Sequence, residues 1–343
     1  MFKRILFIGL GGAGQRHLRL FKHHTPKETE LIAYRSTSKT PVLNSDFTVN
    51  PGNSLEELYG VEIFSNLDDA INTYPDLAVI STPSSLHMEY AQLCAENGIN
   101  IFVEKPLSHS LKDFKRLKET VLSNKLFLQV GFQRRYHPHF NEIQRIISKG
   151  KIGDILSVTM TVSSYIPFWH PYEDFRELYA CKKDLGGGVL LTEIHEFDLC
   201  VWYFGKPFSV TCVGGTFSNV GLDVEDTVRV TLNYKSFLVQ VNLTFWQKHA
   251  ERSVFISGED GCVLWNQDEN SLRIKHYKND NEVTKHIEMN NDSMFKSQVK
   301  DILTPASDKS SVNLNDSYLS IAIVIAAKKS MVEKRTINLD EIN

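Results

Sequence analysis

The stretch Arg4-Ile5-Leu6-Phe7-Ile8-Gly9-Leu10-Gly11-Gly12-Ala13-Gly14 decides the fold of the chain. Residues 4–8 form an apolar run that predicts a buried strand, and an amphipathic helical pattern follows over residues 13–22. Between them, residues 9–14 have the spacing Gly-x-Gly-x-x-Gly. Glycines at these positions allow a tight turn and bring the backbone close to a pyrophosphate, whose charge the helix N-terminus stabilises.

This glycine loop predicts a dinucleotide-binding site, because it directly follows a strand and opens a helix. An ordinary glycine-rich turn between a strand and a helix is the alternative. The residues expected to bind the cofactor here are Gly9, Gly11, Gly12, Ala13 and Gly14.

Short apolar runs alternate with helical patterns over the first 125 residues. The expected strands are 4–8, 30–34, 61–64, 77–81, 100–103 and 127–130, and the expected helices are 13–22, 86–97 and 111–123. Alternation of this kind predicts an α/β fold with a doubly wound parallel sheet that is covered on both faces. We expect residues 1–125 to form the dinucleotide-binding Rossmann domain.

The pattern changes after residue 131. Longer alternating runs at 155–165, 210–217, 227–233, 237–244 and 254–257 predict strands of a mainly antiparallel sheet. Helices are expected at 139–148, 189–203 and 317–332. We expect residues 126–343 to form a second, α+β domain, whose final helix is a candidate to pack back on the first domain.

The composition is that of a globular protein of about two domains, with 343 residues, 42% of them hydrophobic. A net charge of −3 gives no basic excess for a nucleic acid or a membrane surface. The apolar run at residues 5–8 is too short for a secretory signal peptide, and no apolar run reaches the roughly 20 residues of a membrane helix. Five scattered cysteines predict a reduced, cytoplasmic setting and no structural zinc site.

The end of the second expected strand bears on the choice of cofactor. NAD-binding proteins place a carboxylate there to bind the adenosine ribose, but this strand runs into Arg35. A guanidinium suits a 2′-phosphate, and Ser36 and Lys39 add donors. The sequence therefore favours NADP over NAD, the alternative being a solvated basic loop.

Several ordered motifs resemble the Gfo/Idh/MocA oxidoreductases. They are residues 81–87, 100–108 with Glu104-Lys105-Pro106, 186–198 with three glycines leading to His195 and Asp198, 223–227 and 258–261. The resemblance covers essentially the whole chain. It implies an N-terminal Rossmann domain, a C-terminal domain with a large open sheet, a nicotinamide cofactor, and a sugar-like or polyol substrate between the domains. It also implies a homodimer or homotetramer that assembles through the sheet.

The resemblance assigns catalysis to Lys105 and His195. Removal of hydride from a carbinol leaves a proton that a base must take, and histidine suits this because its ordinary pKa is about 6.5. Lysine can act as a base when its pKa is lowered, or polarise the oxygen as a cation. The alternatives are a solvated lysine and a structural histidine. Many family members carry aspartate where this chain has Thr192, which we expect to share a helix face with His195.

Further site residues are expected from the same motifs. Additional cofactor-binding candidates are Thr82, Pro83, His87, Glu104, Lys105 and Arg134. The substrate-binding candidates are Lys105, Arg135, Trp169, His170, Arg176, Thr192 and His195. Either arginine could bind a phosphate or carboxylate or form an interdomain salt bridge, and the segment around Trp169 could stack on a sugar ring or be a packed loop. We expect no metal.

The sequence therefore predicts an NAD(P)-dependent oxidoreductase that transfers hydride between nicotinamide and a hydroxyl or keto carbon of a sugar, sugar derivative or polyol. The alternatives are a non-catalytic NADP-binding sensor or regulator, which Thr192 in place of the usual acid suggests, and a nicotinamide-dependent glycosidase.

Overall fold

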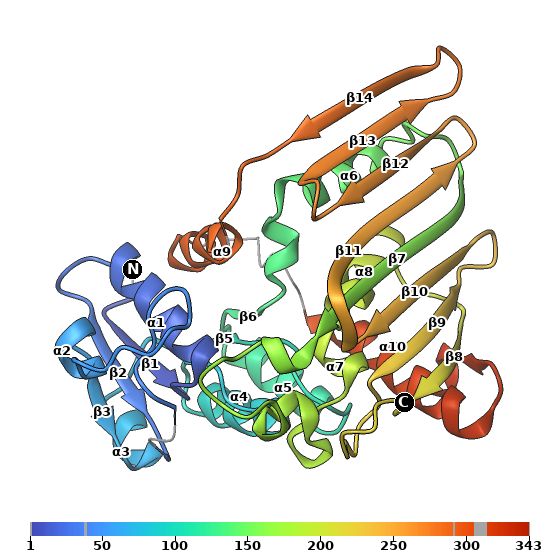
Figure 1. Ribbon diagram of the computed structural model, residues 1–343. Helices are drawn as coiled ribbons and strands as arrows, with labels where there is room; N and C mark the ends of the chain where they lie inside the picture. Colours follow the sequence, from blue (N-terminus) through green and yellow to red (C-terminus); the bar gives the residue numbers. More distant parts are fainter. Residues whose placement is uncertain (1, 38–39, 291, 305–313, 343) are drawn as a thin grey trace. The chain divides into compact units, whose positions relative to one another are not determined.

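The computed structural model describes residues 2–37, 40–290, 292–304 and 314–342 (Figure 1). The chain folds into two compact units. The first comprises Met1–Gln133, His170–Asp174 and Asp292–Ser317, and the second comprises Arg134–Trp169, Phe175–Asn291 and Tyr318–Asn343. The first unit extends past the expected boundary near residue 125 because the sixth strand of its sheet lies at Leu128–Val130.

In the described part of the first unit, six parallel strands form one sheet in the order β3-β2-β1-β4-β5-β6. The strands are β1 (Arg4–Ile8), β2 (Glu30–Tyr34), β3 (Glu62–Phe64), β4 (Leu77–Ile80), β5 (Asn100–Val103) and β6 (Leu128–Val130). The predicted doubly wound sheet is confirmed. Strand order reverses between β1 and β4, and in such sheets ligands bind at the carboxyl ends of the strands beside this switch point.

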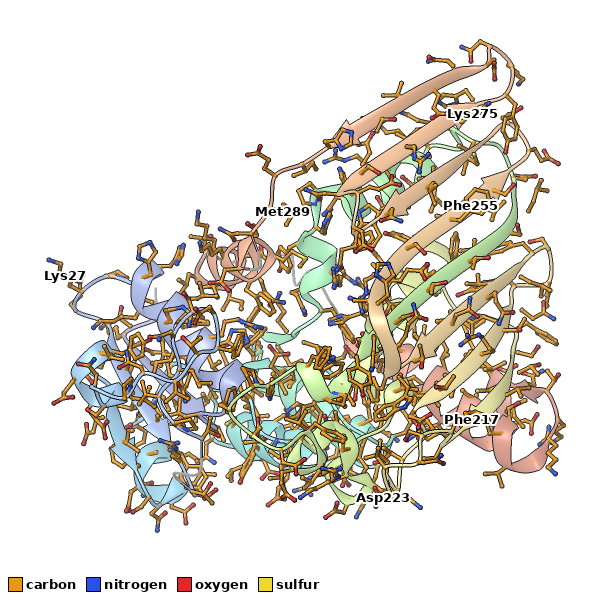
Figure 2. The ribbon with its side chains drawn as sticks, in the orientation of Figure 1. Lys27, Phe217, Asp223, Phe255, Lys275 and Met289 are labelled. Carbon is orange, nitrogen blue, oxygen red and sulfur yellow. The ribbon has the colours of Figure 1, made fainter. Side chains whose placement is uncertain are left out.

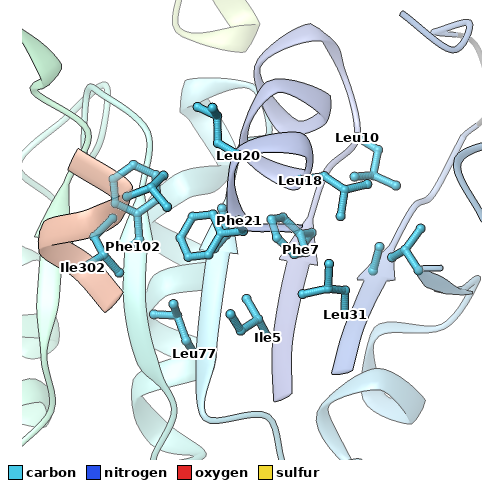
Figure 3. Packing of buried hydrophobic residues seen from close by; sticks show 14 of the residues in the cluster. Ile5, Phe7, Leu10, Leu18, Leu20, Phe21, Leu31, Leu77, Phe102 and Ile302 are labelled. Atoms are coloured by element: carbon cyan, nitrogen blue, oxygen red, sulfur yellow. The ribbon is translucent and has the colours of Figure 1, made fainter. Parts of the chain in front are cut away.

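Helices of the first unit cover a core that includes a segment from late in the sequence. These helices are α1 (Gly12–His24), α2 (Leu55–Tyr59), α3 (Leu67–Ile71), α4 (His87–Glu96), α5 (Phe114–Ser123) and α9 (Ser293–Leu303). Phe7, Phe21 and Phe102 pack in one cluster with Ile302 of α9 (Figure 3). The element that returns to the first unit is therefore α9, while α10 (Leu314–Glu333) belongs to the second unit from Tyr318 onward.

The described residues of the second unit form a nine-stranded sheet in the order β14-β13-β12-β11-β7-β10-β9-β8-β15. Its strands are β7 (Ile155–Tyr165), β8 (Ser209–Gly215), β9 (Thr227–Asn233), β10 (Leu238–Thr244), β11 (Trp246–Gly258), β12 (Gly261–Asn266), β13 (Ser271–His276), β14 (Asn281–His286) and β15 (Ile337–Asn338). Among the described strands of this sheet, only β7 and β10 pair in parallel, so the predicted mainly antiparallel sheet is confirmed.

One face of this sheet is covered by helices α6 (Pro138–Ser148), α8 (His195–Phe204) and α10 (Figure 1). Phe140 of α6 packs on Trp265 of β12, with ring centroids 4.6 Å apart. The opposite, open face carries the exposed side chains of Val213, Leu238 and Phe255, the last of which is labelled in Figure 2. Self-association through this open face stays a prediction.

The helix expected over residues 189–203 is two helices, and this corrects one inference about the site. α7 (Val189–Thr192) ends where Glu193 takes φ −97° and ψ 35°, and α8 begins at His195. The expectation that Thr192 and His195 share one helix face is therefore wrong. The carboxylate of Glu193 pairs with Arg252 of β11, a tertiary contact that the local helical pattern does not contain.

Candidate functional site

The glycine loop places the N-terminus of α1 at the carboxyl end of β1. A Cβ atom at Gly14 would lie 2.2 Å from the carbonyl oxygen of Gly9, so only glycine lets the helix approach the strand this closely. A Cβ at Gly11 would meet nothing within 4 Å. Gly11 is the N-cap residue and has no side chain to cap the first turn. The exposed positive end of the helix dipole fits the pyrophosphate of a dinucleotide.

Arg35 follows β2, where the sequence predicts the cofactor's adenosine ribose to bind. Its guanidinium donates a hydrogen bond to the carbonyl oxygen of Thr40 in the same loop. Burial lowers the pKa of the Arg35 guanidinium, and the charge of Glu56 opposes this shift. Ser36 is exposed, and Lys39 lies outside the described residues.

His87 links the segments that follow β4 and β5. Its Nδ1 lies 2.7 Å from the carbonyl oxygen of Pro106, and its Nε2 lies 2.8 Å from that of Thr82. Desolvation by burial lowers the pKa of His87 although both carbonyl oxygens favour the protonated ring. The side chain thus holds the two strand ends together. The methyl carbon of Thr82 would lie 3.0 Å from a Cβ at Gly9, so this segment borders the glycine loop.

Glu104 and Lys105 follow β5 at the same edge of the sheet. Glu104 Oε1 lies 2.6 Å from Nε2 of the buried His17 of α1. Burial opposes ionisation of Glu104, but the His17 hydrogen bond and the charges of His17, Lys105 and Arg16 hold the pKa of the Glu104 carboxyl below its usual value. Glu104 therefore has a partner in the protein, and the half-buried Lys105 is the next residue along the chain.

In the second unit, Gly188 and Glu225 fix the start of α7. Gly188 has φ +102°, and a Cβ there would lie 2.3 Å from Glu225 Oε1. Leu190 N–H donates to the same carboxylate over 3.3 Å. The three glycines at 186–188 thus lead into the start of α7, which the partly buried Glu225 carboxylate caps. Thr192 and His195 are buried a few residues later.

Buried charges surround the start of α8. Arg252 pairs with Glu193, and its Nε lies 3.4 Å from Glu196 Oε1. Burial raises the pKa of the Glu196 carboxyl, and the charge of Glu193 adds to this, while Arg252 opposes it. Burial, together with the charge of Arg252, lowers the pKa of Arg134 to about 9. Shifted pKa values of this kind are common at functional sites, which makes Glu196 and Arg134 candidates for the site.

Arg135 has a structural partner. Its Nε and terminal nitrogen donate to the two carboxylate oxygens of Asp198 over 3.0 and 2.8 Å, and both side chains are buried. The guanidinium also lies 5.3 Å from the ring centroid of Trp202. The two neighbouring arginines have different surroundings: Arg135 anchors α8, whereas Arg134 lies near the charges of Glu193 and Glu196.

The candidate residues around Trp169 make separate contacts and do not form one binding surface. Trp169 belongs to the second unit and packs edge-on against Phe245, with ring centroids 5.1 Å apart. His170 belongs to the first unit and stacks on Phe47. Arg176 is exposed, with its guanidinium 4.6 Å from the ring centroid of Phe175.

Glu193, Glu196 and Asp198 flank His195 in sequence and are the sequence-based candidates to orient it. Sequence reasoning missed Phe47 and Arg252 as neighbours of the candidate sites, because nothing local marks either residue. Among the described residues, no three His, Cys, Asp or Glu side chains form a metal-binding group. The described helices include none that is long and apolar enough to span a membrane.

A parallel sheet with a glycine loop at its switch point defines a dinucleotide-binding Rossmann protein. Residues 3–132 match the family model described as "Oxidoreductase family, NAD-binding Rossmann fold", and residues 140–264 match the GFO/IDH/MocA C-terminal domain. The chain belongs to the Gfo/Idh/MocA oxidoreductase family, as its motifs predicted.

Curated relatives agree with this assignment, and solved structures share the fold. The chain is 33% identical over 164 residues to scyllo-inositol 2-dehydrogenase (NAD(+)) of Bacillus subtilis, covering 47% of this chain and 45% of that protein. It is 24% identical over 284 residues to myo-inositol 2-dehydrogenase of Thermotoga maritima, covering 78% and 80%. The structure of levoglucosan dehydrogenase in complex with NADH matches with a TM-score of 0.83 and 18% identity, covering 98% of both chains. The chain spans about half the length of several curated relatives, such as 44% of inositol 2-dehydrogenase of Rhizobium meliloti.

The two alanine substitutions in the glycine loop have different expected outcomes. Gly14→Ala should destabilise the fold by about 1–3 kcal/mol or more, because its Cβ overlaps a backbone oxygen that cannot move aside. Gly11→Ala should leave the free energy of unfolding nearly unchanged but weaken dinucleotide binding. Urea unfolding and a fluorescence titration with NADH measure the two effects. Equal stability of the two variants would contradict this account of the loop.

Proposed function

We propose that this protein is an NAD(P)-dependent oxidoreductase that transfers hydride between nicotinamide and a hydroxyl or keto carbon of a sugar, sugar derivative or polyol. The observation that carries the proposal is the placement of Lys105 and the glycine loop at one edge of one sheet. Lys105 follows β5 and the loop follows β1, with β4 between these strands. His87 links the segments after β4 and β5, and Thr82 borders the glycine loop after β1.

The residues that would hold the dinucleotide are those of the glycine loop, Arg35, and the segment from Thr82 to His87. A bound nicotinamide supplies the hydride acceptor or donor. When the substrate carbinol loses hydride, its oxygen must also lose a proton. We assign that proton to the imidazole of His195, and assign to Lys105 the polarisation of the oxygen as a hydrogen-bond donor. In the reverse direction, His195 returns the proton to the oxygen.

Glu193 and Glu196 support this assignment of His195. Family members commonly carry an acid at the position of Thr192, and a hydroxyl cannot replace its charge. In this chain two carboxylates flank His195 in sequence, and both lie buried beside Arg252. Glu193 and Glu196 therefore supply carboxylates near the start of α8, where Thr192 supplies none. Their presence favours a catalytic protein over a non-catalytic sensor.

Lys105→Ala should reduce kcat/KM about 10³-fold while leaving the fold and the Kd for NADH within about twofold, because the ammonium acts on the reacting oxygen. Oxidation of myo-inositol, scyllo-inositol and levoglucosan with NAD⁺ or NADP⁺ provides the assay. The matched control is Lys112→Ala, an exposed lysine of the same unit. His195→Asn should lower kcat, and the ionisation of the catalytic base should disappear from the pH profile of kcat. Full activity of the Lys105 variant would refute the assignment, and cofactor binding without turnover across a broad sugar panel would favour the sensor.

We also propose that NADP is the preferred cofactor. Support comes from Arg35 at the end of β2 and from the absence of a carboxylate at that strand end over residues 34–37. The loop carbonyl of Thr40 holds the guanidinium at this position.

Arg35→Ala should raise the Kd for NADPH about tenfold, or about 1.4 kcal/mol, and leave the Kd for NADH nearly unchanged. Only the 2′-phosphate distinguishes the two cofactors, so the ratio of the two constants isolates its contribution. Lys27→Ala, in the loop after α1 (Figure 2), removes the same charge away from this strand end and serves as the control. Arg35 does not bind the 2′-phosphate if the substitution weakens the binding of both cofactors equally. Tighter binding of NADH than of NADPH by the unsubstituted protein would lead to the same conclusion.

A further inference from the structure

Three aromatic side chains of the first unit form a stack, which we call the ring stack: Phe47, His170 and Tyr172. The ring centroids of Phe47 and His170 are 6.1 Å apart with planes at 13°, and those of His170 and Tyr172 are 5.1 Å apart with planes at 16°. The guanidinium of Arg16 lies 4.8 Å from the centroid of Phe47. The stack therefore joins α1, the loop after β2, and the segment His170–Asp174.

The segment His170–Asp174 is separated in sequence from the rest of the unit in which it packs. The residues that precede it, up to Trp169, and those that follow it, from Phe175, belong to the second unit. The contacts of this five-residue segment stabilise its placement in the first unit. Among the contacts of the described residues are the ring stack, which joins the segment to Phe47, and the internal hydrogen bond between His170 Nδ1 and Glu173 Oε1 at 2.7 Å.

The ring stack ends at the glycine loop. A Cβ at Gly12 would lie 2.9 Å from the hydroxyl oxygen of Tyr172 and 3.1 Å from Cε1 of Phe47. Gly12 is the first residue of α1, and the N-cap residue Gly11 has no side chain. The Tyr172 hydroxyl is thus placed beside the helix N-terminus that fits a pyrophosphate.

The Tyr172 hydroxyl stays protonated and can act as a hydrogen-bond donor. Burial raises the pKa of the phenol, and Glu173 adds to this effect through its charge and a hydrogen bond, so the hydroxyl keeps its proton at any ordinary pH. Its contact with His170 Nδ1 is long, at 3.3 Å. Because His170 Nδ1 donates its own proton to Glu173, it does not accept from Tyr172; the acceptor of the Tyr172 proton is the Glu173 carboxylate. A diphosphate oxygen is an acceptor of the same charge-assisted kind.

We propose that Tyr172 is a cofactor-binding residue whose hydroxyl donates a hydrogen bond to the diphosphate of the dinucleotide. Phe47 and His170 are positioning residues that hold its ring beside Gly12. This inference rests on the proposed function, since it requires that the glycine loop bind a dinucleotide. It assigns His170 to the cofactor site, whereas the sequence suggested the substrate site.

The test compares the Kd values of NADH, NADPH and ADP-ribose for the unsubstituted protein and for Tyr172→Phe. All three ligands contain the diphosphate, and ADP-ribose lacks the nicotinamide. Tyr172→Phe retains the ring of the stack and removes only the hydroxyl, so each Kd should rise by the same factor of about ten. Tyr74→Phe, at an exposed tyrosine of the same unit, should change none of them.

A second pair of variants tests the positioning role of His170. His170→Ala opens the stack and should raise the Kd of ADP-ribose, whereas His170→Phe retains a stacking ring and should restore most of the affinity. Thermal unfolding of each variant checks that the fold is intact.

Each contrary outcome has a defined meaning. An unchanged Kd for Tyr172→Phe overturns the inference, and tighter binding would show that the segment competes with the diphosphate. A loss confined to NADH and NADPH would place the hydroxyl at the nicotinamide and overturn it as well. If the unsubstituted protein bound none of the three ligands, the proposed function itself would fail.

Discussion

The close approach of α1 to β1 is the constraint on which the rest of the first unit depends. The carbonyl oxygen of Gly9 occupies the space that a side chain at Gly14 would need, so the helix begins directly at the end of the strand. This turn places the N-terminus of α1 at the switch point between β1 and β4. The positive end of the helix dipole, Lys105 after β5, and Arg35 after β2 are consequently found at the carboxyl ends of neighbouring strands.

In the second unit, buried ion pairs hold α8 in place. Arg135 and Asp198 are both buried and doubly hydrogen-bonded, and Arg252 joins Glu193 and Glu196 at the start of α8. Removal of one partner of such a pair leaves a buried charge and costs about 3–5 kcal/mol. These pairs fix the position of α8, and hence of His195, more firmly than its short flanking helix α7 could. They also explain why charged residues are tolerated in an otherwise apolar region.

Much of the fold could be predicted from the sequence because its signals are local. Each strand of the first sheet is a short apolar run between breakers, and the glycine loop and the Glu-Lys-Pro motif mark the strand ends. The rest depends on contacts between distant residues. α9 reads as an amphipathic helix only once Phe295, Val299 and Ile302 have a core to face, and the break at Glu193 depends on Arg252 of β11. The placement of His170 and Tyr172 beside the glycine loop likewise has no local signal.

The most direct test of the account is hydrogen–deuterium exchange of the backbone amides with and without NADH or NADPH. The central claim is that a dinucleotide binds at the carboxyl ends of β1, β4 and β5, where the first-turn amides of α1 would donate to its phosphates. The account predicts slower exchange at residues 9–15, 82–87 and 170–174 when the cofactor binds, and unchanged exchange in β14 of the second unit. Saturating cofactor that left exchange at residues 9–15 unchanged would contradict it.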